Sequence, residues 1–348
     1  MRCPALNELP PPPLGKSGWP WTEESPFLPE KMPGGSPWPR ITVSTPNYNF
    51  ADFIEETIRS VLLQGYPDLE YIITDDGSTD GSAEVIRKYE PWLAHWETQE
   101  NRGQSHAINQ GWRRGSGDIF AYLNSDDCLK PGALAAVAGV VNPVEGRHIV
   151  FGDCDVVDEK GKKIGNCRGR LPWPGDLLKY WEHDFTIPQP SVFFHGDILR
   201  RVGYLDESFH YVMDYDYWVR ISRYYRFHYV NQVLAIMRDH SRAKTSTVIH
   251  ELLEPEWFRI LKKSRGDLSP CTWLRYYLLA RNYRSRVLRL NAYAARENIS
   301  LEEFRGKIFR SLAANPFNFF NPKYLSALFR AVAGHSRADQ AKRILGRN

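Results

Sequence analysis

The sequence predicts an α/β fold: a mostly parallel, doubly wound sheet flanked by helices, followed by a smaller mixed subdomain and a C-terminal helical extension. Three observations predict it. Strand-like runs alternate with helical patterns between residues 40 and 145. The strand-like runs are almost wholly apolar, as in a parallel sheet that is covered on both faces. Polar, aspartate-rich segments directly follow several of these runs.

The first half alternates strand and helix with short connections. Apolar residues recur at helical spacing over residues 52–64, and Gly65 closes that helix. Pro131 suits the first position of another helix. The strands are expected at 41–45, 69–74, 94–98 and 118–123, and the helices at 52–64, 82–89, 105–113 and 131–141.

This alternation stops near residue 146. We expect strands at 148–152 and 191–195, a hairpin at 156–165, and helices at 198–202 and 214–223. Residues 251–348 are expected to be mostly helical, with breaks at Asn315-Pro316 and Asn321-Pro322. The predicted parts are therefore 1–39, 40–145, 146–250 and 251–348.

The first 39 residues are rich in proline, including four in a row at Pro10–Pro13. Proline lacks the N–H that regular ladders need. We expect an extended or disordered lead-in, although Trp19, Trp21 and Trp38 could dock it onto the body of the protein.

The charge is unevenly distributed along the 348 residues. The formal net charge is only +4, and no Lys/Arg-rich run of five or more occurs, so nucleic acid is not an expected partner. From Pro255 onward 19 Lys/Arg oppose 6 Asp/Glu, an excess of +13, which leaves −9 for the first 254 residues. An acidic first part thus precedes a basic tail.

The five cysteines are odd in number and form no C-x-x-C pair, which disfavours a disulfide framework or a zinc knuckle. The sequence begins without a signal-peptide pattern, and no window reaches the ~18 apolar residues needed to span a bilayer. We expect a cytoplasmic protein that touches a membrane, if at all, only peripherally at its inner face.

Two acidic segments carry most of the chemistry. Asp75-Asp76 and Asn124-Ser125-Asp126-Asp127 each follow an apolar strand, so they should meet at the carboxyl edge of the sheet. Each alone would be read as a turn or helix cap. Together they predict a nucleotide-diphosphate site with Mg²⁺ or a similar ion, which favours carboxylate oxygens.

Two further segments are weaker signals. The segment 101–109 opens a helix after Gly103, where phosphate or sugar contact is expected and where His106 is read as structural. Asp214 and Asp216 begin another helix, where capping explains either carboxylate by itself. Glycine-rich dinucleotide and P-loop motifs are absent from the sequence.

In this order, these segments resemble the family 2 glycosyltransferases of the GT-A fold over residues 40–245. The resemblance is carried by Val43 to Asn49, Asp75 to Asp80, Asn101 to Gly103 with Ala107 and Asn109, Ser125 to Asp127, Val202 to Glu207, and Asp214 to Asp216. Relatives often have an aspartate where Asn124 stands and a glutamate where Met213 stands.

The resemblance implies roles for individual residues in nucleotide binding. Tyr48 would stack on the base, Asp76 would accept a hydrogen bond from it, and Pro46 would shape their loop. Asp126 would face the ribose, and Arg102 would contact the nucleotide.

The resemblance also implies which residues bind the metal ion, act as general base and contact the acceptor. Asp127 would ligate Mn²⁺ or Mg²⁺, with His240 near the metal or the diphosphate, although a surface-loop histidine is an equal alternative. Asp214 would be the general base of an inverting single displacement. Candidate acceptor residues are Trp173, Trp181, His183, Gln189 and His210, which could equally belong to the core.

The implied function is transfer of a sugar from a nucleotide-sugar donor, with UDP as the expected nucleotide, to a saccharide or lipid-linked acceptor in polysaccharide biosynthesis at the cell envelope. A non-catalytic sugar-nucleotide-binding protein is the alternative, and a nucleotidyltransferase is less favoured. The basic tail either docks on an anionic membrane surface or packs as a helical cap.

Overall fold

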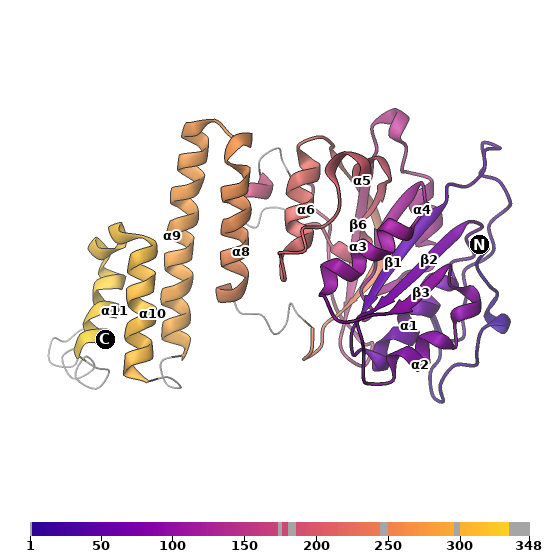
Figure 1. Ribbon diagram of the computed structural model, residues 1–348, viewed down its shortest axis with the longest axis horizontal. Helices are drawn as coiled ribbons and strands as arrows, with labels where there is room; N and C mark the ends of the chain where they lie inside the picture. Colours follow the sequence, from indigo (N-terminus) through magenta and orange to yellow (C-terminus); the bar gives the residue numbers. More distant parts are fainter. Residues whose placement is uncertain (1, 173–175, 180–185, 244–249, 296–299, 334–348) are drawn as a thin grey trace. The chain divides into compact units, whose positions relative to one another are not determined.

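A computed structural model describes residues 2–172, 176–179, 186–243, 250–295 and 300–333. The chain divides into two compact units. The first comprises residues 1–177 and 183–247, and the second comprises residues 178–182 and 248–348. Figure 1 shows the sheet and its helices in the first unit, and helices alone in the C-terminal part of the second.

The first unit is built on one mixed sheet of nine strands. Its strand order is β3-β2-β1-β4-β8-β6-β9-β5, with β7 paired to β6. The strands β3, β2, β1 and β4 are parallel to one another, whereas β8 runs antiparallel between β4 and β6. The strands are β1 (Ile41–Asn47), β2 (Leu69–Asp75), β3 (His95–Thr98), β4 (Ile119–Tyr122), β5 (Cys128–Leu129), β6 (Ile149–Val157), β7 (Lys163–Cys167), β8 (Phe193–His195) and β9 (Phe227–Arg238).

Helices cover both faces of this sheet, so its central strands are buried on both sides. The helices are α1 (Ala51–Leu62), α2 (Ser82–Arg87), α3 (Gln104–Arg114), α4 (Ala133–Ala138), α5 (Asp197–Val202) and α6 (Met213–Ser222). Val43 of β1 belongs to the core that α1 and α4 share. Ser44 points to the opposite face, where a Cβ at Gly111 of α3 would lie 2.1 Å from its Oγ. Glycine therefore lets α3 approach the sheet closely.

The N-terminal segment is docked on α1. The Arg59 side chain is buried, and its guanidinium donates to the carbonyls of Pro10, Pro20 and Trp21. Proline-rich chain has few N–H donors but keeps every carbonyl, so a buried arginine can satisfy several of them. The expected extended lead-in is thus extended but ordered.

Most predicted elements are present within a few residues of their expected bounds. The predicted helix 131–141 is shorter and is preceded by the strand β5. The sequence analysis missed β5 and the 12-residue strand β9. All five cysteines are free thiols, as expected.

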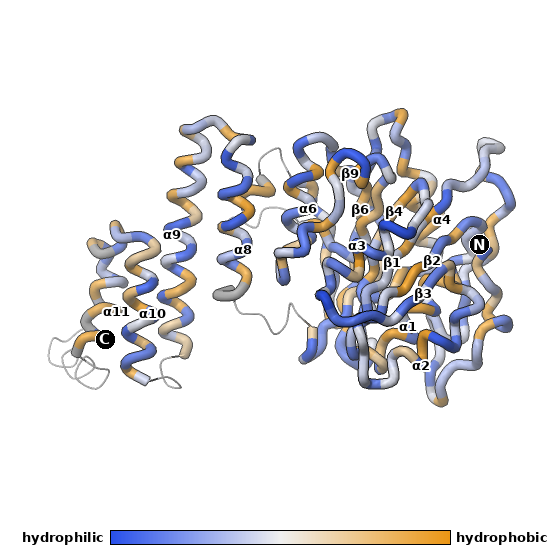
Figure 2. The backbone as a smooth tube through the Cα atoms, viewed as in Figure 1, coloured by the Kyte–Doolittle hydropathy of each residue, from blue (hydrophilic) through white to orange (hydrophobic). Residues whose placement is uncertain are grey.

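The second unit is helical, as the sequence predicted. Its helices are α8 (His250–Lys263), α9 (Pro270–Ala295), α10 (Leu301–Ala314) and α11 (Pro322–Ala333), with short 3-10 turns at Ser264–Asp267 and Pro316–Phe320. Hydrophobic and hydrophilic stretches alternate along them (Figure 2). Among the described residues, no helix is long and apolar enough to cross a membrane.

Candidate active site

A cavity of about 420 Å³ opens at the carboxyl ends of β1, β2 and β4. The chain places β2 and β3 on one side of β1 and β4 on the other, which creates a topological switch point between β1 and β4. Ligands bind at such points in open α/β sheets. Six of the eight predicted site residues line this cavity: Pro46, Tyr48, Asp76, Asp126, Asp127 and Asp214. Residues up to 168 positions apart in the sequence thus meet in one place.

The two aspartates after β2 have different surroundings. Asp75 accepts hydrogen bonds from the Asn47 amide (2.7 Å), the Thr98 hydroxyl (2.9 Å), and both the Ser78 hydroxyl (2.6 Å) and N–H (3.1 Å). Asp76 lines the cavity and accepts from the Gln99 amide at 2.8 Å. Burial raises the pKa of Asp76, and the Gln99 hydrogen bond partly offsets this. Asp75 therefore shapes the loop, while Asp76 faces the ligand space.

The two aspartates after β4 also differ. Asp127 is buried, and its carboxylate accepts from the Arg238 N–H at 3.1 Å and the Asn124 amide at 3.3 Å. Burial and the neighbouring charge of Asp126 raise the pKa of Asp127 well above its usual value. Asp126 instead lies 3.0 Å from Nε2 of His240. His240, which we expected near the metal or the diphosphate, makes this contact with Asp126.

The charge of Arg238 compensates only part of the effects that raise the pKa of Asp127 beside Asp126. The guanidinium of Arg238 forms an ion pair with Glu56 at 3.0 Å and donates to main-chain carbonyls, among them that of Asp126. Only its main-chain N–H reaches the Asp127 carboxylate. Two adjacent carboxylates in a buried setting repel each other, and a divalent cation would relieve this. The residues present therefore fit such an ion.

The hydrogen bonds of Asn124 account for an amide at a position where relatives often have an aspartate. Its amide oxygen accepts from Gln104 at 2.7 Å, and its NH₂ group donates to Asp127 at 3.3 Å and to Gln189 at 3.2 Å. An aspartate here could not donate and would add a third negative charge. The amide thus supports the buried carboxylate of Asp127.

The first turn of α6 carries Asp214 into the cavity, with Met213 beside it. The phenol of Tyr215 hydrogen bonds to the carbonyl of Leu177, which holds this turn. Asp216 is buried and forms an ion pair with Arg220 at 2.8 Å.

Arg102 lies apart from the other predicted residues. It is exposed and lines a smaller hollow of about 70 Å³ with Glu207 and His210. His106, which we read as structural, lies 3.0 Å from Glu207. Of the candidate acceptor residues, Gln189 lines the main cavity, whereas Trp173, Trp181 and His183 lie outside the described residues.

Sequence reasoning missed Arg242, which also lines the cavity. Its guanidinium is half-exposed, lies 2.8 Å from Asp52 and stacks near the rings of Phe50 and Phe53. An arginine two positions after His240 was the available signal. It adds the positive charge that a diphosphate would need.

The comparisons with known proteins point to one family. Residues 42–243 match the model of glycosyl transferase family 2. An uncharacterised glycosyltransferase of Rickettsia typhi is 28% identical over 236 residues, which cover 65% of this chain and 72% of the relative. One from a Nostoc species is 36% identical over 136 residues, 38% of this chain and 42% of the relative.

Solved structures share the fold. TarS of S. aureus in complex with UDP-GlcNAc aligns with a TM-score of 0.57 and 16% identity over 88% of this chain and 92% of that one. The mannosyltransferase PcManGT of Pyrobaculum calidifontis, in complex with GDP-Man and Mn²⁺, aligns with a TM-score of 0.52 and 20% identity over 96% and 92%. These likenesses confirm the predicted GT-A fold, and the match over residues 42–243 shows that the chain belongs to glycosyl transferase family 2.

Proposed function

We propose that this protein transfers a sugar from a nucleoside-diphosphate donor to a hydroxyl group of a saccharide or lipid-linked acceptor. The observation that carries the proposal is the convergence of Asp76, Asp126, Asp127 and Asp214 on one cavity at the carboxyl edge of the sheet. A scaffold protein would gain nothing from four carboxylates gathered around a cavity, because their mutual repulsion costs stability.

In this proposal the loops after β1 and β2 bind the nucleotide. Tyr48 is 47% exposed at the cavity and would stack on the base. Asp76 would accept a hydrogen bond from the base, for which uracil is the first candidate. Arg242 would contact the diphosphate. The exposed position of Arg102 gives it at most a peripheral contact.

Asp126 is the better-placed ligand for a divalent cation. Both carboxylates line the cavity, but that of Asp127 already accepts two hydrogen bonds from the protein, whereas that of Asp126 lies 3.0 Å from Nε2 of His240. When bound, Mn²⁺ or Mg²⁺ would act as a Lewis acid that stabilises the charge developing on the leaving diphosphate. The N–H of Arg242 donates to Nδ1 of His240 at 3.3 Å, so in the neutral ring the proton is on Nε2. His240 is therefore suited to donate to Asp126 or to a phosphate oxygen.

Asp214 would act as general base. It would take the proton of the acceptor hydroxyl as that oxygen bonds to the anomeric carbon. The bond from that carbon to the phosphate oxygen breaks in the same step, and its electron pair leaves with the nucleoside diphosphate. A single displacement of this kind inverts the anomeric configuration.

The test is release of nucleoside diphosphate from a panel of UDP- and GDP-sugars with Mn²⁺ or Mg²⁺ and candidate acceptors. We expect Asp214→Asn to lower turnover by about 10² to 10⁴-fold, because it removes the base. Glu84→Gln, an exposed carboxyl on α2 outside the cavity, is the matched control and should retain activity.

The alternative is a binding protein without turnover. Tight donor binding with no release from any donor, with free and lipid-linked acceptors supplied, would favour it. Full activity of Asp214→Asn would instead assign the base to another residue.

We further propose that the second unit contacts an anionic membrane. Its residues from Pro255 onward carry a charge excess of +13, and Leu274, Leu278, Phe317 and Phe320 are exposed there. Some of its arginines serve the fold, since Arg281 donates to the carbonyl at the end of α10. Salt-sensitive binding of the whole chain to vesicles with anionic lipid would support the proposal, and equal binding to neutral vesicles would contradict it.

A further inference from the structure

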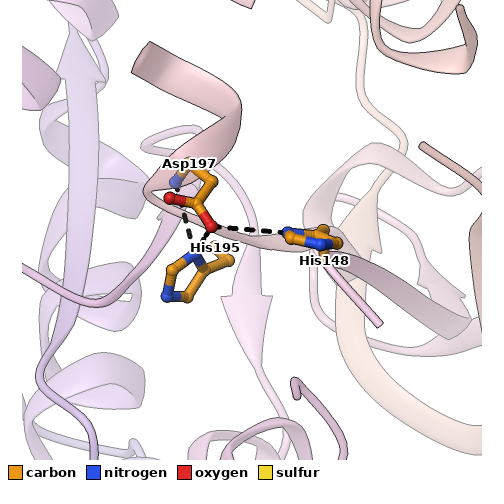
Figure 3. Close-up of side chains that lie close together, drawn as sticks. All are labelled: His148, His195 and Asp197. Carbon is orange, nitrogen blue, oxygen red and sulfur yellow. Dashed lines mark hydrogen bonds and ion pairs between the residues drawn. The ribbon is translucent and has the colours of Figure 1, made fainter. Parts of the chain in front are cut away.

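A second cluster of metal-ligating side chains lies at the opposite edge of the sheet. His148 directly precedes β6, His195 ends β8, and Asp197 begins α5 (Figure 3). His195 pairs with Ile119, the first residue of β4, whereas the donor cavity lies beyond the last residue of that strand. In the part of the chain that the structure describes, this is the group whose three ligand atoms all lie within 4.8 Å of one another.

The backbone fixes the two histidines next to each other. The N–H of His195 donates to the carbonyl of His148 at 2.7 Å, and their ring centres lie 6.1 Å apart. Oδ2 of Asp197 lies 3.1 Å from Nδ1 of His195 and 3.7 Å from Nδ1 of His148. Ligands at 2.0 to 2.1 Å in a tetrahedral zinc site are about 3.3 Å apart. The two distances from the carboxylate are within about 0.4 Å of this value, and all three ligand atoms lie within 4.8 Å of one another, so the cluster must contract to bind zinc.

Hydrogen bonding within the described part of the chain leaves one of the two imidazole Nδ1 atoms without a partner and gives the other a single weak one. The main-chain N–H of Asp197 donates to Nδ1 of His195 at 3.2 Å, which requires that nitrogen to be unprotonated. Its lone pair is then close to the carboxylate. Nδ1 of His148 is buried and has no hydrogen-bond partner among the described residues. A cation that displaced the Asp197 N–H from His195 would be shared by the two Nδ1 atoms and the Asp197 carboxylate.

We propose that His148, His195 and Asp197 bind one Zn²⁺ ion through the two Nδ1 atoms and a carboxylate oxygen, with water as the fourth ligand. Imidazole nitrogen favours zinc over Mg²⁺ or Mn²⁺, which prefer oxygen. This site is therefore distinct in chemistry from the acidic cavity. Bound zinc would tie together the start of β6, the end of β8 and the start of α5.

Arg200 competes with the ion. Its guanidinium forms an ion pair with Asp197 from the next turn of α5, but the arginine side chain is 72% exposed. Exposed pairs of this kind contribute little to stability, so zinc could displace it. Arg200→Ala should therefore tighten zinc binding.

The test is Zn²⁺ titration of the whole protein in an Asp126→Asn background, which keeps the acidic cavity from contributing. We expect one equivalent to bind, and His195→Ala and Asp197→Asn each to weaken binding by at least about 100-fold. Zinc at 100 times its Kd should raise the Tm by about 5–10 °C. Co²⁺ in its place should give the strong visible bands of a four-coordinate site.

His95→Ala is the matched control. The Nε2 atom of His95 is likewise buried without a hydrogen-bond partner and lies 3.7 Å from Glu97. Its loss should leave zinc affinity unchanged. Equal affinity in natural protein, His195→Ala and Asp197→Asn would overturn the proposal, as would no gain from Arg200→Ala. If His195→Ala does not fold, Asp197→Asn and Arg200→Ala still decide it.

Discussion

The loops after β2 and β4 each carry two adjacent aspartates, yet the protein treats the two pairs differently. Asp75 accepts four hydrogen bonds at 2.6 to 3.1 Å, two from Ser78 in its own loop and one each from the last residues of β1 and β3. Asp127 accepts two, at 3.1 and 3.3 Å, next to the charge of Asp126. Hydrogen bonds from the protein satisfy Asp75 more fully than Asp127, and the pKa of Asp127 is raised well above its usual value. We infer that the first loop is preformed for a neutral base and the second for a cation.

Replacement of Asp126 should distinguish the role of the loop after β4 from that of the loop after β2 most clearly. We expect Asp126→Asn to lower kcat/KM by about 10³-fold, because charge stabilisation by a catalytic cation contributes several kcal/mol. The measurement is nucleoside diphosphate release across a range of Mn²⁺ concentrations. Excess Mn²⁺ should not restore the rate. Near-normal activity in this variant, with a large loss in Asp127→Asn, would return the ligand role to Asp127.

Replacement of Asp75 tests whether its hydrogen bonds stabilise the loop after β2. We expect Asp75→Ala to lower the free energy of unfolding by about 2 kcal/mol, since it removes the acceptor of the buried Asn47 amide, of the half-buried Ser78 and of the exposed Thr98 hydroxyl. Urea denaturation measures this. Asp76→Asn, with one side-chain donor in Gln99, is the comparison and should cost about 1 kcal/mol or less. Equal costs for both would contradict the distinction.

The strands of residues 40–145 and the polar loops that follow them could be predicted from the sequence, because each buried strand is a local apolar run that ends in polar residues. The different surroundings of the two aspartates in each pair could not be predicted, since they depend on Thr98 and Arg238, which are distant in sequence. The strand β9 was missed because its residues are partly polar and its place beside β6 is a long-range pairing. Nothing in the sequence near Arg59 indicates its burial, because the carbonyls of Pro20 and Pro10 that accept its hydrogen bonds lie 39 and 49 positions away.

Asp76 tests the base-binding role. We expect Asp76→Asn to raise KM for the donor by about 10 to 100-fold with little change in kcat, because a hydrogen bond to a charged acceptor is lost from substrate and transition state alike. Initial rates at varied donor concentration measure this. A fall in kcat at unchanged KM would place Asp76 in the chemical step instead.

The smallest effect concerns the pH dependence of stability without metal. Because burial and Asp126 raise the pKa of Asp127 in the folded state, that state holds the proton more tightly than the unfolded chain does. The group therefore weakens folding as the pH rises from about 4, the usual pKa of aspartate, towards the raised value. Asp127→Asn removes this titration.

The stability of the natural protein relative to Asp127→Asn should accordingly fall between pH 4 and pH 7 in EDTA, by urea denaturation. Comparing the two proteins cancels the carboxyls whose pKa is lowered, such as Asp80 and Asp155, which they share. Saturating Mn²⁺ should reverse the trend, since a cation stabilises the charged pair that the asparagine lacks. A pH-independent difference would mean that hydrogen bonds from the protein satisfy Asp127 as fully as Asp75.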